Sequence, residues 1–384
     1  METLSVTQPV VINHVQQPKH LKSREKFMRD IEEMLTLDEK SSADFILALR
    51  KRWADTVYPA FIEEIDASGV KIDSPQEGEI KVKQMSLYPW FSHLERIGQK
   101  MLWRLGSDVV MRCQDELLGQ LKVASSSDKG SLELNPELEL PKWYTDVDIH
   151  MQPGSFFSND LSGYVYQFGA RVVMLRDNDG FKFHKLFSKT ALPDLPAKPT
   201  VVDIACGFGK STKPLVSRYP DAQVIGVDLA APGLKLAHAE AQSEGLPIHY
   251  KQQDGRKVGL PDASVDLVTG TMILHEMPQK AIVETVEEAA RLLKPGGVIR
   301  FLEFQPTGDP VRDTTVYEHA ERNNEPYFRD LFATDLLEVC EKLGLKDAKW
   351  VAFDERADGL RPQGWPERSD WHFPWCVLQA TKVA

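Results

Sequence analysis

The fold is decided by a short stretch, Thr200-Val201-Val202-Asp203-Ile204-Ala205-Cys206-Gly207-Phe208-Gly209. It begins as an apolar β-branched run, which favours a buried strand, and it is followed by residues with helical spacing from about Ser211. The glycines remove side chains where the backbone must approach a ligand, and the start of a helix offers free N–H groups there. The stretch therefore predicts a strand, a tight ligand-binding turn and a helix.

Two well-known glycine motifs match this stretch only in part. A dinucleotide-binding turn of the type G-x-G-x-x-G requires glycine at position 212, where the chain has Thr212. A phosphate-binding loop ending in Gly209-Lys210-Ser211 requires an earlier glycine at position 204, which is Ile204. A nicotinamide cofactor and a turn that binds nothing stay open as alternatives.

Acidic residues end the next two strand-like runs. The run from 223 to 227 leads into Asp228, whose carboxylate can accept hydrogen bonds from both hydroxyls of a ribose. The run from 248 to 252 leads into Gln253-Asp254-Gly255, where a carboxylate can accept from an adenine amino group. Each has a structural alternative: Asp228 can cap a helix, and Asp254-Gly255 can form a simple turn.

The run from 265 to 269 continues through Thr271 to His275-Glu276. A zinc protease motif needs a second histidine at 279, where the chain has Gln279, so we expect no metal here.

Strand-like runs alternate with helical stretches after about residue 196, which is typical of a parallel sheet between helices. A fifth run from 298 to 303 and two late runs, 348–353 and 373–381, complete an α/β, Rossmann-like, seven-stranded and mostly parallel sheet with helices on both faces. The earlier part of the chain has helical spacing and predicts a mainly α-helical cap. We therefore expect an arm at residues 1–20, a cap and substrate domain at 21–190, and a cofactor-binding domain at 191–384.

The bulk composition excludes several classes of protein. A formal net charge of −11 disfavours nucleic-acid binding, which needs a basic surface. No segment is apolar for long enough to cross a membrane, and the start of the chain does not look like a signal peptide. The four cysteines form no CxxC pair, so we expect reduced thiols in a cytoplasmic protein: Cys113, Cys206, Cys340 and Cys376.

The strand-end motifs, taken in order together with Leu292-Leu293-Lys294-Pro295-Gly296-Gly297, resemble those of class I S-adenosylmethionine-dependent methyltransferases. The nearest group includes the ubiquinone and menaquinone biosynthesis methyltransferases, and the resemblance covers about residues 197–305. It implies S-adenosylmethionine as cofactor and a domain of the Rossmann-like type.

The resemblance also implies roles for individual residues. Gly207 and Gly209, with Ala205 in the same turn, would line the methionine portion, and Asp203 would hold its ammonium group. Asp228 would bind the ribose. The residues implied around the adenine and the sulfonium are Asp254, Gly255, Leu229 and Thr271.

Methyl transfer requires an acceptor lone pair in line with the S–CH3 bond and the exclusion of water. A hydroxyl or thiol acceptor would need a base, and His275 is the best-placed histidine, although it can equally cap or pack the following helix.

Two segments are candidates for the acceptor pocket. The first runs from Trp143 to Phe168 and is rich in aromatic residues, from which we select His150 and Tyr164; it can equally form a core seam. The second contains Tyr327 and Arg329, and Arg329 could bind an acceptor carboxylate or form an ordinary salt bridge.

The sequence thus predicts an enzyme that methylates an oxygen, sulfur, nitrogen or carbon atom of a small molecule. The alternatives are an NAD-dependent oxidoreductase and a non-catalytic Rossmann-like binding module. We also expect a possible homodimer formed through the N-terminal helical region.

Overall fold

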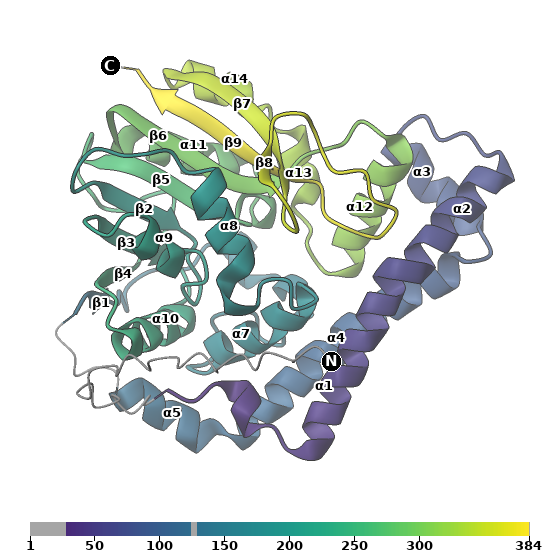
Figure 1. Cartoon of the computed structure of the whole chain (residues 1–384), viewed down its shortest axis with the longest axis horizontal. Helices are drawn as coiled ribbons and strands as arrows, with labels where there is room; N and C mark the ends of the chain where they lie inside the picture. The colour runs from purple at the N-terminus through teal and green to yellow at the C-terminus, as the bar shows by residue number, and fades with distance from the viewer. Residues whose placement is uncertain (1–27, 124–128, 384) are drawn as a thin grey trace, which may run out of the picture.

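The computed structural model describes residues 28–123 and 129–383, so the expected N-terminal arm at residues 1–20 lies outside the described residues. Its centre is one nine-stranded sheet with the strand order β1-β4-β3-β2-β5-β6-β9-β7-β8 (Figure 1). The strands are β1 Ser131–Glu133, β2 Thr200–Ile204, β3 Gln223–Asp228, β4 Ile248–Gln252, β5 Val265–Thr271, β6 Leu293–Phe304, β7 Leu345–Asp354, β8 Gly359–Arg361 and β9 Trp375–Lys382.

The strands from β1 to β6 in this order pair in parallel, whereas β9, β7 and β8 pair antiparallel. The predicted α/β class and mostly parallel sheet are confirmed. The predicted count of seven strands is wrong, because β1 and β8 extend the two edges. Each has only three residues, too few for a periodic pattern, and each is held by its neighbour rather than by its own sequence.

Helices cover both faces of the sheet. On one face lie α8 (Lys182–Thr190), α9 (Thr212–Arg218) and α10 (Ala231–Glu244), and on the other lie α11 (Gln279–Leu292) and α14 (Leu336–Lys342). Alternate side chains of β2 point to opposite faces, so Val201 belongs to the first layer and Val202 to the second. This explains why the central strands are apolar throughout.

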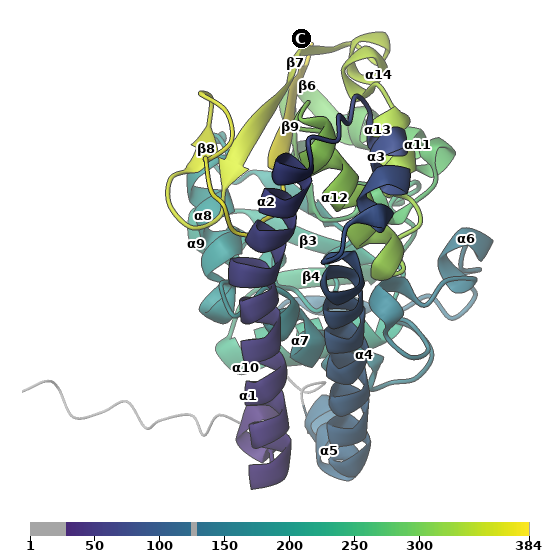
Figure 2. The ribbon, with the colours of Figure 1, turned by 90° about the vertical axis from the view of Figure 1, so that its right-hand side faces the viewer.

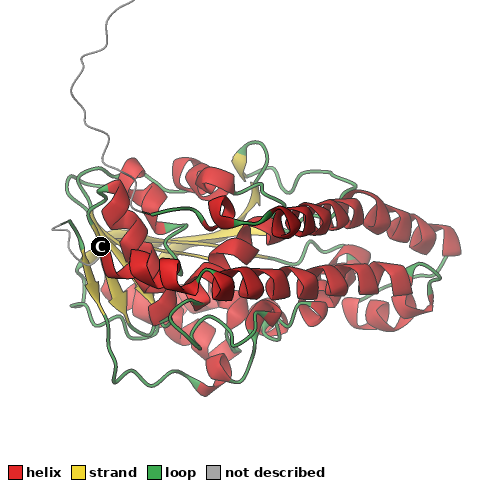
Figure 3. Cartoon of the chain, turned by 90° about the horizontal axis from the view of Figure 1, so that it is seen from below, coloured by secondary structure: helices red, strands yellow, loops and turns green. Residues whose placement is uncertain are grey.

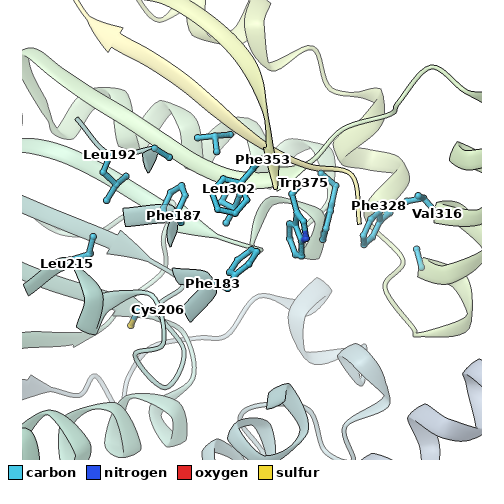
Figure 4. Close-up of a cluster of buried hydrophobic side chains, with 14 of the residues drawn as sticks. Phe183, Phe187, Leu192, Cys206, Leu215, Leu302, Val316, Phe328, Phe353 and Trp375 are labelled. Carbon is cyan, nitrogen blue, oxygen red and sulfur yellow. The ribbon is translucent and has the colours of Figure 1, made fainter. Parts of the chain in front are cut away.

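The core beneath α8 is aromatic. Phe183 and Phe187 of that helix meet Phe353 of β7 and Trp375 of β9, with ring centroids 5.0 to 6.2 Å apart (Figure 4). Because α8 and β1 precede residue 191 and still pack on the sheet, the N-terminal half is joined to it over a wide area.

The rest of the N-terminal half is mainly helical, as predicted. The helix α1 (Leu37–Arg52) starts with a capping box between Thr36 and Glu39 and runs through a π-helical turn into α2 (Tyr58–Ser68). It lies beside α4 (Tyr88–Arg112) along one side of the molecule (Figures 2 and 3). The other α-helices of this half are α3 (Pro75–Lys81), α5 (Gln114–Val123), α6 (Lys142–Thr145) and α7 (Ser162–Val173). Two more, α12 (Pro310–Arg322) and α13 (Phe328–Ala333), follow β6.

None of the helices in residues 28–123 and 129–383 combines the length and apolar character that crossing a membrane requires.

Candidate functional site

The turn after β2 adopts the backbone conformation that its sequence predicts. Ala205, Gly207 and Gly209 all have positive φ, at 57°, 54° and 84°. The Gly207 N–H donates to Oδ2 of Asp228 at 2.8 Å, and the Ala230 N–H donates to Oδ1 of the same carboxylate at 2.7 Å. Asp228 thus ties the turn to the end of β3, while each oxygen keeps a lone pair for a further hydrogen bond.

A cavity of about 220 Å³ opens at the carboxyl ends of β2 to β5 and extends beneath α1, α4 and α12. Six of the predicted cofactor residues line it: Ala205, Gly207, Asp228, Leu229, Asp254 and Gly255. Three elements far apart in the sequence therefore converge on one space, as expected for a ligand at the strand ends of an open α/β sheet.

Asp254 is already engaged in an ion pair. Its carboxylate accepts from Arg256 Nε at 3.0 Å and Nη2 at 2.6 Å, and the same guanidinium donates to Glu284 at 2.9 Å. An adenine amino group would share this carboxylate with Arg256.

Three predicted cofactor residues do not line the cavity. Asp203 accepts from the hydroxyls of Ser211 at 2.7 Å and Thr212 at 2.6 Å, so it fastens the start of α9. Burial raises its pKa to about 6, although these hydrogen bonds oppose the shift. A Cβ added to Gly209 would lie 2.7 Å from the Tyr250 hydroxyl.

Thr271, the third, is buried at the end of β5, and its Oγ1 lies 3.4 Å from His184 Nε2. These three residues therefore lie outside the cavity and stabilise the turn and the strand end that form its wall.

Lys210 lines the same end of the cavity, a role that the sequence analysis did not assign. It is only 7% exposed, and its Nζ donates to the Tyr166 hydroxyl at 2.8 Å. The ammonium also lies 5.0 Å from the ring centroid of Tyr166 and 5.9 Å from that of Phe208. No carboxylate lies within ion-pair distance of its Nζ in the described part of the chain, and its charge acts at longer range on the buried carboxylates of Asp203 and Asp228.

A row of charged side chains, each in contact with the next, lies along the wall of the cavity. His150 Nδ1 lies 2.9 Å from Oε1 of Glu325, and its Nε2 lies 3.1 Å from Oε1 of Glu276. His275 Nε2 lies 3.5 Å from the same Glu276 oxygen, and its Nδ1 lies 2.7 Å from Oε2 of Glu303. Glu303 also accepts from the backbone N–H groups at 273 and 274, which fixes the row to the end of β5.

These contacts set the protonation of the row. Burial lowers the pKa of His275, but the charge of Glu303 and the hydrogen bonds to Glu276 and Glu303 outweigh it and raise the pKa to about 10. The carboxylates Glu276 and Glu325 likewise outweigh burial and raise the pKa of His150 well above its usual value. Burial acts to raise the pKa of Glu276, but the charges of His150 and His275 and their hydrogen bonds together outweigh it and lower the pKa to about 2.

The carboxylates beside His275 thus favour its protonated form, which weighs against the predicted general-base role. The prediction considered only the place of His275 at the strand end, and its role in proton transfer stays a prediction. Its imidazole packs against the stacked rings of Phe304 and Phe328, with centroid distances of 4.7 and 4.8 Å.

Of the four predicted acceptor residues, only His150 lines the cavity. Tyr164 is 1% exposed within another core cluster. Tyr327 donates to the Trp143 carbonyl at 3.2 Å, and Arg329 forms an ion pair with Glu79 on the surface. The structural alternatives given above for Tyr164 and Arg329, a core seam and an ordinary salt bridge, match their surroundings.

Aromatic side chains form much of the remaining wall, and several of them were missed because they lie far along the chain from the predicted strand ends. They are Trp53, Tyr144, Phe156, Tyr166, Phe304, Trp371, Phe373 and Trp375. Only the richness of the segment 143–168 in aromatic residues signalled this wall in the sequence.

One acidic group has the spacing of a metal site among the described residues, and it comprises Glu79, Glu318 and Glu321. Glu79 pairs with Arg329, and Glu318 pairs with Arg322 at 2.6 Å. Their charge is largely balanced by these arginines.

Comparison with known proteins identifies part of the chain. Residues 201–297 match the family described as a methyltransferase domain. The chain is 40% identical over 101 residues to trans-aconitate 2-methyltransferase of Azoarcus sp. (strain BH72), covering 26% of this chain and 37% of that protein. It is 32% identical over 110 residues to demethylmenaquinone methyltransferase of Thermus thermophilus, covering 29% of this chain and 49% of that protein.

Among solved structures, phosphoethanolamine N-methyltransferase 2 of Haemonchus contortus aligns with a TM-score of 0.43 and 15% identity, covering 59% of this chain and 58% of that one. The chain spans half or less of the length of the two curated relatives above. The matches confirm the resemblance of this region to class I S-adenosylmethionine-dependent methyltransferases.

Proposed function

We propose that this methyltransferase domain binds S-adenosylmethionine and that the protein is an enzyme that transfers the methyl group to a small-molecule acceptor by in-line displacement. The support is the convergence of Asp228 and Lys210 on one cavity at the strand ends. A ribose requires a carboxylate with free lone pairs, and a methionine carboxylate requires a cation that is not already paired.

Hydrogen bonds within the protein already orient the Asp228 carboxylate for a ribose. Burial raises its pKa, although the backbone N–H groups of Ala230 and Gly207 oppose the shift by stabilising the carboxylate. The same two hydrogen bonds hold both oxygens in place, so little side-chain entropy is lost on binding.

Lys210 fits the carboxylate of the methionine portion. Its Nζ has three donors, of which one is used by the Tyr166 hydroxyl. A ligand carboxylate would place a negative charge in contact with the ammonium, which offsets the free-energy cost of burying it.

Bound S-adenosylmethionine supplies a methyl group that its sulfonium already activates. The protein has to orient the acceptor and keep water out. The segment from α6 to α7 covers the cofactor end: Gly163 of α7 packs so closely on α10 that a Cβ there would lie 2.6 Å from the Pro232 carbonyl oxygen. Tyr166, about one helical turn further along α7, lies over Gly207.

Calorimetric titration with S-adenosylhomocysteine tests this function. We expect saturable binding to the full chain and a loss of at least about tenfold in affinity in Asp228→Asn, because one charge-assisted acceptor is removed. Asp221→Asn is the matched control, since Asp221 is exposed beyond the opposite end of β3. Absence of binding, or stronger binding of NADH, would overturn the proposal.

Four further expectations stay predictions. A cytoplasmic location is supported by four unpaired, buried cysteines. A homodimer through the helical region is supported by exposed apolar side chains at Leu37, Phe45 and Trp90. The division into domains at residue 190 and the absence of nucleic-acid binding also await direct tests.

A further inference from the structure

We infer that the methyl acceptor is an amine carried on an apolar, ring-bearing body, and that Glu276 accepts the hydrogen bond from its N–H. This inference rests on the proposed function and extends it to the class of substrate. It is carried by an unpartnered carboxylate oxygen in the wall of the cavity and by the line of aromatic rings that starts beside it.

Glu276 has one free oxygen. Its Oε1 faces both His150 and His275, at 3.1 and 3.5 Å, whereas Oε2 is buried and has no hydrogen-bond partner among the described residues. A buried carboxylate oxygen without a donor is costly, so its retention points to a donor on the ligand. Because Glu276 follows the end of β5, this donor would lie near the strand ends that bind the cofactor.

Five other side-chain atoms in the wall are also buried without a partner among the described residues. They are Asn323 Oδ1, Glu355 Oε2, Arg50 Nε and the indole Nε1 atoms of Trp103 and Trp143. Of the two carboxylates, only Glu276 belongs to the segment that joins β5 to α11.

An aromatic line leads away from this point. The ring of Phe304 lies 4.7 Å from that of His275, 4.4 Å from Trp375 and 4.9 Å from Phe373. Phe373 continues to Trp371 at 5.8 Å, and Trp371 reaches Trp53 of the helical cap at 5.5 Å. Such a wall holds an apolar ring, and its faces attract a positive charge.

The wall of the cavity holds seven carboxylates, against three lysine and arginine side chains. The seven are Glu95, Asp177, Asp228, Asp254, Glu276, Glu325 and Glu355. Three of them, Glu95, Asp254 and Glu355, pair with Arg322, Arg256 and Arg368, which lie outside the wall. Lys210 is the one lysine of the wall, and the proposed function assigns it to the cofactor, so a carboxylate on the acceptor would find no lysine to pair with.

The same groups distinguish nitrogen from oxygen. Transfer to a hydroxyl requires a base to remove its proton, but both ring nitrogens of His150 and of His275 already face carboxylates, at 2.7 to 3.5 Å. Transfer to an uncharged amine requires none. The nitrogen lone pair forms the N–C bond as the S–C bond breaks, and the electron pair of that bond stays on sulfur. The product is an ammonium ion, whose new charge Glu276 stabilises.

A panel of matched compounds tests the inference on the full chain loaded with S-adenosylhomocysteine. Tryptamine, tryptophol and indole-3-propionate share one ring system and differ in carrying an amine, a hydroxyl or a carboxylate. Phenethylamine, 2-phenylethanol and phenylpropionate form a second set. We expect the amines to raise the melting temperature more than their partners. With labelled S-adenosylmethionine at about pH 9, we expect label in the amines alone.

The variant Glu276→Gln keeps the size of the side chain but removes its charge. We expect it to lose about 100-fold in kcat/KM with the best amine and to lose the amine-dependent rise in melting temperature. Its affinity for S-adenosylhomocysteine should stay within about threefold of the wild type. Glu287→Gln is the control, because Glu287 lies exposed on α11.

Preferential binding or methylation of an alcohol or a carboxylate would overturn the inference, and so would a panel in which no amine binds or accepts the methyl group. A Glu276→Gln enzyme that retains its amine activity would also contradict it. These outcomes are distinct from failure of the proposed function, in which S-adenosylhomocysteine itself would not bind.

Discussion

Replacing Lys210 by methionine removes a buried ammonium and keeps an unbranched apolar stem. If Lys210 binds the methionine carboxylate, a charge-assisted hydrogen bond of about 1.5–3 kcal/mol disappears, which weakens binding of S-adenosylhomocysteine about 10- to 150-fold. The fold should tolerate the change, because within the described part of the chain the ammonium has no ion pair and one hydrogen bond, to Tyr166.

Calorimetry with two ligands separates this effect from general damage. The compound 5′-methylthioadenosine contains the same adenosine and sulfur but has no carboxylate, so its affinity should change less than about threefold in Lys210→Met. Lys280→Met is the matched control, since the side chain of Lys280 is 87% exposed on α11. Equal weakening of both ligands, or no weakening of either, would refute the role of Lys210.

Three further changes test other parts of the account. In His275→Gln, the deficit in the free energy of unfolding should be largest below about pH 6.5 and shrink toward pH 10, because a raised pKa stabilises the folded state only while the histidine is protonated; urea titrations across this range measure it. In Gly163→Val, the new side chain meets the Pro232 carbonyl oxygen, so urea unfolding should show a loss of about 1–3 kcal/mol. In Tyr166→Phe, loss of the hydroxyl that orients Lys210 should weaken S-adenosylhomocysteine about two- to tenfold by calorimetry, with an unchanged melting temperature.

The parts of the fold that local sequence determines were predicted well. A strand, a glycine turn and a helix succeed one another at residues 200–218, so backbone preference and burial agree there. Asp228 and Asp254 follow from the same rule, because the ends of parallel strands meet at one edge. The short strands β1 and β8 carry no such local signal.

The acceptor side was predicted less well because distant segments build it. Tyr164 and Tyr166 lie two residues apart on α7, which turns them about 200° from each other, so only Tyr166 faces the cavity. Sequence alone did not reveal which of the two would do so.

The roles of Glu276 and Lys210 depend on partners far along the chain. Glu276 sits between His150 and His275, and Lys210 meets Tyr166 of α7. The carboxylate beside His275 was missed for the same reason, since Glu303 lies on the neighbouring strand. Protonation is set by three-dimensional surroundings, which no spacing in the sequence records.

A crystal structure of the full chain with S-adenosylhomocysteine tests the central claim most directly. We expect the ribose on the Asp228 carboxylate, the methionine carboxylate at Lys210 Nζ, and the sulfur facing the space beside Glu276 Oε2. A ligand bound outside this cavity, or with its carboxylate away from Lys210 and its ribose away from Asp228, would contradict the account.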